Sequence, residues 1–330
     1  MMRRRLLARG RSYGLSLIEM LVSITIGLVV IAGILSVYAS GSTATSLVHA
    51  QNQMNEDAQL ALGILTNELR QAGFRHTNAN RPPVWRSNPL IASPTAVVSP
   101  VNATATNTVT ASLFVCSTLF SSATVSDIHS LTCGSDTSSF SLALTYEADA
   151  YSPSKTSTGK AADCLGNAIG TQSFTILGTG TFATSTTVLS VVDNRYFVQN
   201  GALKCVGNAS FSAGAQSLVE NVVSMELTLG VGTPSSTASA TVTGRLSPTQ
   251  IGPVRAGESE TNVASSLAGL SMIERWSLVR TVKICLVIQS ERAVLAEDAY
   301  YHDCSGSVLS TVGRKLRRAY TTTVILRNRI

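Results

Sequence analysis

The chain has 330 residues, of which 44% are apolar and only 13% are charged. This composition excludes a disordered chain and is sufficient for one large domain or two small ones. The formal charge of +6 depends on five arginines within the first eleven positions. Without residues 1–14 the chain has 20 basic and 19 acidic residues, so little remains of a basic surface for nucleic acid.

An apolar segment follows the arginines. Residues 20–37 are apolar apart from two serines and one threonine, and no charged residue occurs from Met20 to Asn55. Eighteen helical residues at about 1.5 Å each cover roughly 27 Å, close to the hydrocarbon thickness of a bilayer. The basic residues before the segment predict a single membrane span, with the N-terminus in the cytoplasm and everything after about residue 40 outside.

Glu19 lies at the start of this segment and narrows its interpretation. A secretory signal peptide cut at residues 37–39 and a plain signal anchor both remain open. Neither explains the carboxylate, because an unpaired charge in lipid costs about 2.5 kcal/mol or more. We therefore expect Glu19 to have a partner.

Residues 14–19, with the sequence Gly-Leu-Ser-Leu-Ile-Glu, resemble the processing and methylation motif of type IV prepilins and pseudopilins. The resemblance implies that a prepilin peptidase cleaves between Gly14 and Leu15 and methylates the new amine of Leu15. It also implies that Glu19 pairs with the amine of a neighbouring subunit, since the two buried charges neutralise each other. Leu15 departs from the usual phenylalanine of the motif, and Ser36 stands where many major pilins have a proline.

A helical pattern continues beyond the span. Apolar residues recur at steps of three, four and seven from Leu47 to Ala72, and Gly73 is placed to end a helix. We expect a leader over residues 1–14 and one helix over residues 15–73, with residues 15–39 as its membrane and assembly half. Two helices broken near residues 40–42 remain an alternative.

Residues 74–330 are expected to form a β-rich periplasmic domain. Residues 87–126 carry no charge and are dominated by Ser, Thr, Ala and Val, which disfavours helix. The dipeptide Asn200-Gly201 predicts a tight hairpin. The strands are expected over residues 108–116, 140–146, 173–177, 186–192, 195–199, 202–206, 219–229, 278–288 and 321–326, with a long loop over 230–271. The predicted fold class is α+β, a long N-terminal helix packed on an antiparallel or mixed sheet.

Six cysteines follow the predicted span, on its outward side, where an even number favours disulfides. Sequential pairing is our prediction, while other pairings and free buried thiols remain open. The cysteines are Cys116, Cys133, Cys164, Cys205, Cys285 and Cys304.

The chain shows no motif for catalysis or for a cofactor. No metal site is expected, because no cysteines have zinc-ligand spacing and the triplet His302-Asp303-Cys304 stands without a second ligand cluster. The four histidines have unrelated surroundings, and no nucleophile, nucleotide or dinucleotide motif occurs. We therefore expect neither an enzyme nor a nucleotide-binding protein.

Four segments, residues 61–74, 218–227, 276–284 and 318–328, resemble the PilW family of minor pilins. The resemblance implies a pilin-like fold and a part in initiating type IV pilus assembly. The implied partners are the prepilin peptidase, other minor pilins, the major pilin, an inner-membrane assembly platform with its ATPase, and the lipid bilayer. The implied location is the inner membrane and then the pilus, with the fibre tip as one place.

Two alternatives to the pilus function stay open. The first is a minor pseudopilin of a type II secretion system, which PilW proteins also resemble. The second is a surface adhesin or DNA-uptake module, for which the Ser/Thr-rich body could serve. The sequence does not choose a DNA or host ligand.

Overall fold

The computed structural model describes residues 14, 16–74, 112–125, 131–148, 155–176, 185–233, 242–252, 262–270, 275–276 and 278–329. The chain divides into two compact units, Met1–His49 and Ala50–Ile330. The boundary between the units falls within the first helix. Each unit is described by itself below.

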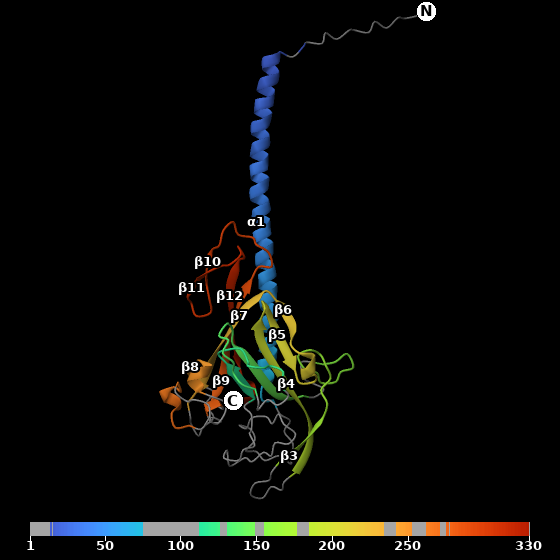
Figure 1. The fold of residues 1–330 in the computed structure, drawn as a ribbon, viewed down its shortest axis with the longest axis vertical. Coiled ribbons are helices and arrows are strands. Elements are labelled where there is room, and N and C mark those ends of the chain that lie inside the picture. The colour runs from blue at the N-terminus through green and yellow to red at the C-terminus, as the bar shows by residue number, and fades with distance from the viewer. Residues whose placement is uncertain are drawn as a thin grey trace, which may run out of the picture. The chain divides into compact units, whose positions relative to one another are not determined.

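A single helix, α1, opens the described structure and runs from Leu17 to Gln71 over 55 residues (Figure 1). The alternative of two helices broken near residues 40–42 is therefore not what the structure has. Gly73 follows the helix with a φ of 77°, a left-handed conformation that favours glycine and ends helices.

The described body is built from strands and a few short helical turns. The strands are β1 (Leu113–Cys116), β2 (Ser141–Ala148), β3 (Gln172–Ile176), β4 (Ser185–Gln199), β5 (Ala202–Gly207), β6 (Gln216–Glu220), β7 (Val222–Gly232), β8 (Val242–Leu246), β9 (Val279–Gln289), β10 (Tyr300–His302), β11 (Val308–Ser310) and β12 (Arg317–Ile325). The helical turns are η3 (Phe211–Ala213), α2 (Pro248–Ile251), η4 (Ser265–Leu267) and η5 (Arg327–Arg329).

These strands form three sheets. The first has the order β1-β2-β4-β5-β6, with β3 also paired to β4; the second has the order β12-β9-β7-β8; β10 and β11 form a separate hairpin. Every pairing between the named strands is antiparallel. The predicted α+β class is confirmed.

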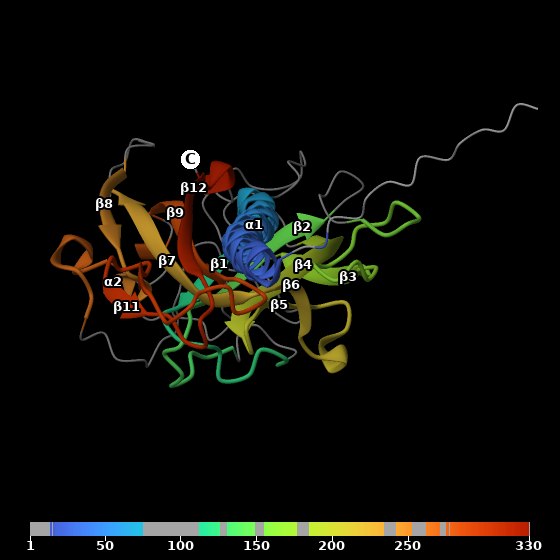
Figure 2. The same ribbon diagram turned by 90° about the horizontal axis from the view of Figure 1, so that it is seen from above.

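The main core of the second unit lies between the two larger sheets and residues 50–71 of α1. In Figure 2, β12 lies on one side of this part of α1, and β2 and β4 lie on the other. Side chains of α1 and of both larger sheets are buried in one cluster, which includes Leu65 of α1, Leu144 of β2 and Ile284 of β9. A smaller apolar cluster on the other face of the first sheet includes Phe114, Phe120 and Phe197.

The predicted break between residues 186–192 and 195–199 is wrong, because β4 continues through Asp193, Asn194 and Arg195. These polar residues resemble a turn in the sequence. In the structure their side chains bond to one another or to α1, so a buried strand accommodates them. The predicted hairpin turn after β4 is confirmed: Asn200 has φ 56° and Gly201 has φ 75°.

The predicted single strand over residues 219–229 is also wrong. Asn221 has φ 64°, a left-handed conformation that Asn tolerates, and it separates β6 from β7. Since β6 belongs to the first sheet and β7 to the second, Asn221 is the point at which the chain changes sheets.

The predicted long loop over residues 230–271 contains regular structure that the composition did not reveal. β7 extends to Gly232, and β8 pairs with it through residues 242–246. A four-residue helix, α2, begins directly after Ser247, whose backbone N–H donates a hydrogen bond to Gln250 Oε1 at 2.9 Å.

Candidate functional site

The candidate site begins where α1 begins. Ser16 stands immediately before the helix, and its Oγ accepts a hydrogen bond from the backbone N–H of Glu19 at 3.3 Å. This is the cap of a helix N-terminus, in which a serine satisfies an amide that has no partner within the helix. Glu19 lies in the first turn, where a negative charge is favourable to the helix dipole.

Gly14 and Glu19 are exposed, and the space around Gly14 is open. Leu15, the residue predicted to carry the new amine, lies outside the described residues. Because Ser16 lies on the C-terminal side of the predicted cut, the cap of α1 belongs to the part of the chain that would remain after cleavage.

The helix of the first unit is apolar on all sides. Sixteen of its large apolar side chains are 50% or more exposed within the chain, so nothing in the described structure covers them, and Leu47 is half-buried. The exposed apolar side chains are Leu17, Ile18, Met20, Leu21, Val22, Ile24, Ile26, Leu28, Val29, Val30, Ile31, Ile34, Leu35, Val37, Tyr38 and Val48. By length and composition α1 qualifies as a membrane span. An apolar surface around a whole helix requires lipid or neighbouring protein.

Six serine and threonine hydroxyl groups in this half of α1 bond to backbone carbonyls of the helix itself. Ser23 Oγ donates to the carbonyl of Glu19 at 2.7 Å, and Thr25 Oγ1 donates to that of Val22 at 2.8 Å. Thr43 and Thr45 donate to carbonyls four residues earlier. These polar atoms therefore need no water, which suits a helix in an apolar environment.

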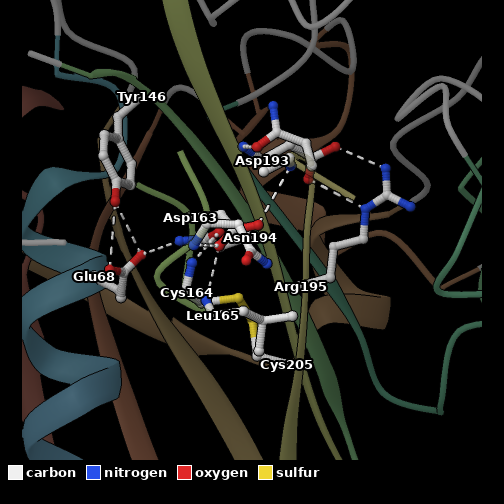
Figure 3. The surroundings of a disulfide bond; sticks show 12 residues. Glu68, Tyr146, Asp163, Cys164, Leu165, Asp193, Asn194, Arg195 and Cys205 are labelled. Atoms are coloured by element: carbon white, nitrogen blue, oxygen red, sulfur yellow. Dashed lines mark hydrogen bonds and ion pairs between the residues drawn. A yellow bond between two sulfur atoms is a disulfide. The ribbon is translucent and has the colours of Figure 1, made fainter. Parts of the chain in front are cut away.

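The second half of α1 has one buried face, and that face contains a carboxylate. Glu68 is 4% exposed among alanine, methionine and leucine side chains. Its Oε2 accepts hydrogen bonds from Asn194 Nδ2 at 2.8 Å and from the Tyr146 hydroxyl at 3.3 Å (Figure 3). Because Tyr146 belongs to β2 and Asn194 to β4, Glu68 ties α1 to two strands of the first sheet.

Asn194 connects this group to a disulfide. Its Oδ1 accepts a hydrogen bond from the backbone N–H of Cys164 at 3.0 Å, and Cys164 is bonded to Cys205 of β5 (Figure 3). Tyr196 of β4 is also buried here. Its burial raises the pKa of its phenol well above the ordinary value, and the negative charge of Glu68 raises it further.

The opposite face of β4 carries a buried ion pair. Arg195 is completely buried, and its Nη2 lies 2.7 Å from Asp193 Oδ2. Its Nη1 donates to the carbonyls of Ala123 and Val125 at 2.8 and 2.6 Å, and Phe211 stacks on its guanidinium at 4.3 Å. The arginine thus holds two loops against the back of the first sheet.

The end of α1 is bound by the last described residues. The Asn328 side chain donates to the carbonyls of Arg70, Gln71 and Ala72 at 3.0–3.4 Å. Tyr320 of β12 donates to Asn55 Oδ1 at 2.8 Å. The Asn328 bonds supply partners to carbonyls that a helix end leaves unsatisfied, and the Tyr320 bond ties β12 to the middle of α1.

All six cysteines are in disulfides, and the order is the sequential one that the sequence favours: Cys116–Cys133, Cys164–Cys205 and Cys285–Cys304. Each disulfide ties a loop to a strand. His302 is exposed in β10, and within the described ranges no three His, Cys, Asp or Glu residues group around a possible metal position.

Sequence reasoning missed Glu68, Asn194 and the Asp193–Arg195 pair. A signal for Glu68 was available, because it lies three residues after Leu65 and so falls on the same face of the helix. The partners of Glu68 on β2 and β4 carry no such signal, since the sequence does not say which strands lie under the helix.

Comparisons with known proteins agree with this arrangement. Residues 191–328 match the family Type IV Pilus-assembly protein W, and residues 9–35 match the Prokaryotic N-terminal methylation motif. No curated protein matches the chain. One solved structure, the Type IV-like pilin TTHA1219 from Thermus thermophilus, aligns with 83% of this chain and 95% of its own at 10% identity and a TM-score of 0.31.

A capped apolar helix with a methylation motif, continuing into an antiparallel body, defines a type IV pilin-like protein. Within that class, residues 191–328 match the PilW family and residues 9–35 match the methylation motif, so the chain is similar to PilW-type minor pilins. It is thus a structural component of the pilin type, with a membrane-anchoring helix and interactions with other pilins and the prepilin peptidase as general properties of such proteins.

Proposed function

We propose that this chain is a minor pilin that takes part in initiating type IV pilus assembly and enters the fibre through α1. The observation that carries the proposal is the methylation motif at the start of an exposed apolar helix, joined to a PilW-type body. Such a helix gains free energy only by leaving water, in the bilayer first and among neighbouring subunits afterwards.

The prepilin peptidase would cleave between Gly14 and Leu15 and methylate the Leu15 amine. The amine would then lie at the positive end of the helix dipole, an unfavourable place for a cation. The Glu19 carboxylate of a neighbouring subunit would neutralise it. An unpaired buried ion costs about 3–5 kcal/mol, so this pairing would decide whether a subunit is stable in the bundle.

Before assembly the protein would cross the inner membrane once, with its N-terminus in the cytoplasm and its disulfide-bonded body in the periplasm. Its partners would be the other minor pilins, the major pilin and the assembly platform, and the fibre tip is the location that fits a subunit acting at initiation. No catalytic role, nucleotide or cofactor is part of this proposal.

The test is a Glu19→Ala variant expressed in the native cell in place of the original chain. We expect mass spectrometry to find Leu15 as its N-terminus and electron microscopy to find about tenfold fewer pili or less, since a loss of even about 1.4 kcal/mol is tenfold in an equilibrium. Glu56→Ala removes an exposed carboxylate from the same helix in the second unit and is the matched control.

Normal pilus numbers with Glu19→Ala would refute assembly through this carboxylate. Normal pilus numbers in a strain that lacks the whole chain would refute the role in initiation. A mature protein that begins near residue 40 would show that the segment is an ordinary signal peptide.

A further inference from the structure

The Cys164–Cys205 disulfide lies close to the buried carboxylate of α1 (Figure 3). Cys164 belongs to a tight loop, residues 161–169, which we call the Cys164 loop. The backbone N–H of Ile169 donates to the carbonyl of Ala161 at 3.0 Å and closes the base of the loop. The chain turns at Gly166, which has φ 78°, a left-handed conformation that glycine adopts without strain.

Asp163 holds the Cys164 loop together and attaches it to the end of β5. Its side chain is completely buried, and its Oδ1 accepts the backbone N–H groups of Leu165 and Asn167, both at 3.0 Å. Its Oδ2 accepts the backbone N–H of Ala209, just after β5, at 3.3 Å. The approach is so close that a Cβ at Gly207, the last residue of β5, would overlap the Asp163 carboxylate.

The Cys164 loop places the backbone N–H of Cys164 against the side chain of Asn194. In the pairing of β4 with β5, Asn194 lies directly opposite Gly207, the position at which the loop approaches the sheet. Asn194 is completely buried, and its Oδ1 accepts the Cys164 N–H at 3.0 Å. Since the sulfur of Cys164 is bonded to Cys205 of β5, the disulfide helps to keep this N–H in place.

The bond from Cys164 determines which way round the Asn194 amide lies. A side-chain amide has its acceptor oxygen on one side and its donor nitrogen on the other. With Oδ1 turned to Cys164, Nδ2 faces Glu68 of α1 and donates to its Oε2 at 2.8 Å. If the Cys164 loop moved away, the amide would be free to turn over and present its oxygen to the carboxylate, where two acceptors repel each other.

The hydrogen bond from Asn194 matters for the docking of α1 on the first sheet. Glu68 is 4% exposed, and a buried carboxylate is costly unless donors surround it. The bond from Asn194, at 2.8 Å, is shorter than the bonds from the Tyr146 hydroxyl, at 3.3 and 3.4 Å. Without it, burying Glu68 against the sheet becomes less favourable. The position of the Cys164 loop is therefore coupled to the docking of α1.

A second loop has the same construction and lacks the connection to the helix. Residues 303–306 repeat the order Asp-Cys-x-Gly of residues 163–166. The Asp303 carboxylate accepts backbone N–H groups two and four residues later, at 3.0 and 2.8 Å, and Cys304 is bonded to Cys285 of β9. In the described part of the chain, residues 303–307 make no hydrogen bond to α1, so this loop is a matched control.

We propose that the Cys164–Cys205 disulfide is a redox-sensitive switch for the docking of the second half of α1, and that Asn194 transmits its state to Glu68. On oxidation, the two thiols lose two protons and two electrons to an external protein or glutathione disulfide, which becomes two thiols, while one S–S bond forms in the chain. The Cys164 loop is then held on β5, and the Asn194 amide faces Glu68.

On reduction, the Cys164 loop and the C-terminal part of α1 loosen together. A chain that has not reached an oxidising compartment therefore has a loosely docked helix. The switch lies entirely within the second unit, goes beyond the proposed function and does not depend on it.

The first test is backbone hydrogen exchange of the full-length chain in detergent, measured by mass spectrometry. Cys164→Ser with Cys205→Ser should speed exchange in residues 61–71 about tenfold and leave residues 282–288 of β9 within about twofold. Cys285→Ser with Cys304→Ser removes the disulfide of the control loop and should leave residues 61–71 unchanged. Equal acceleration of residues 61–71 in the two variants, or no acceleration in the first, would overturn the switch.

The second test uses a chain that keeps all six cysteines. Because coupling between two sites is reciprocal, a weaker contact to Glu68 must make the Cys164–Cys205 disulfide easier to reduce. Asn194→Ala should lower the equilibrium constant for its oxidation by glutathione about tenfold, measured by alkylation of free thiols and mass spectrometry. Glu68→Gln, which keeps an acceptor for the amide, should lower it less.

The Cys285–Cys304 disulfide of the same molecules is the internal control and should keep its equilibrium constant. If Asn194→Ala unfolded the body, both disulfides would become easier to reduce. A fall confined to Cys164–Cys205 would support the switch. An unchanged constant, or equal falls for both disulfides, would overturn it. Neither test involves pilus formation, so a failed switch leaves the proposed function standing.

Discussion

The two halves of α1 have the same secondary structure and opposite relations to their surroundings. In the first unit, apolar side chains point in every direction, and Leu28 is 62% exposed within the chain. In the second unit, the helix has one buried face, on which Leu65 is completely covered. The helix is thus continuous in its hydrogen bonding, but its first half needs apolar surroundings and its second half packs one face on the body.

In each half of α1, the pattern of side chains, and not helix propensity, determines whether the helix surface is apolar all round or buried on one face. Valine and isoleucine are only moderate helix formers, yet they fill the first half, where apolar surface is what the helix needs. Small alanines occupy the buried face of the second half, at positions 50, 58 and 61, and allow the sheets to approach the helix closely.

The same leucine-to-alanine substitution, made once in each half of α1, should have very different effects on the free energy of unfolding. Leu65→Ala should lower the free energy of unfolding of the body by about 2–5 kcal/mol, because it leaves a cavity in the core. Leu28→Ala makes the same chemical change in the first unit and should leave that free energy unchanged. Urea unfolding of the full chain in detergent, followed by tryptophan fluorescence, measures both; an equal loss in the two variants would contradict the division.

The next largest effect on the free energy of unfolding is expected from Glu68, the carboxylate on the buried face of α1. Glu68→Ala removes the acceptor of the Asn194 amide and one acceptor of the Tyr146 hydroxyl, so we expect a loss of about 2 kcal/mol in the same unfolding measurement. Glu68→Gln keeps a carbonyl oxygen at this position and should lose less. Glu56→Ala, on the exposed side of the same helix, is the control, and a loss as large there would show that burial of Glu68 is not the cause.

The smallest effect concerns Glu226 of β7. Desolvation raises the pKa of its carboxyl above the ordinary value, and the negative charge of Asp303 adds to this, while Lys283 opposes it. The charged form is thus less favourable in the folded chain, and this cost appears as the pH rises above the unfolded pKa. Because the group is partly exposed, solvent screens the cost to less than about 0.5 kcal/mol.

Glu226→Gln should therefore raise the thermal unfolding temperature slightly at pH 7. At about pH 3 the glutamate is protonated in both the folded and unfolded states, so the two proteins should unfold at the same temperature. Differential scanning calorimetry at the two pH values measures the effect. A larger gain at the lower pH would reverse the sign that we assign.

Sequence alone predicted the features that depend on neighbouring residues. The helix end at Gly73, the Asn200-Gly201 turn and the methylation motif are each encoded within a few consecutive positions. The apolar span follows from composition over a short window in the same way. The fold class followed from the contrast between the helical first 73 residues and the Ser/Thr-rich remainder.

Features that depend on distant partners were missed. Asp193 and Arg195 look like turn residues until the loop carbonyls that bind Arg195, some 70 residues earlier, are known. In the sequence, Asn221 lies in what looks like the middle of a strand. The structure is needed to show that the chain passes there from the first sheet to the second. The strands β10 and β11 have three residues each and mixed polarity, so they carry no periodic signal.

The bonds from Asn328 to the end of α1 have a consequence for how the protein is made. The donor and the first of these carbonyls are separated by 258 positions, so the helix end acquires this partner only after residue 328 has been synthesised. Contacts of such long range form slowly, since the intervening chain must be ordered first. Closing the C-terminal end of α1 is therefore expected to be a late step in the folding of this body.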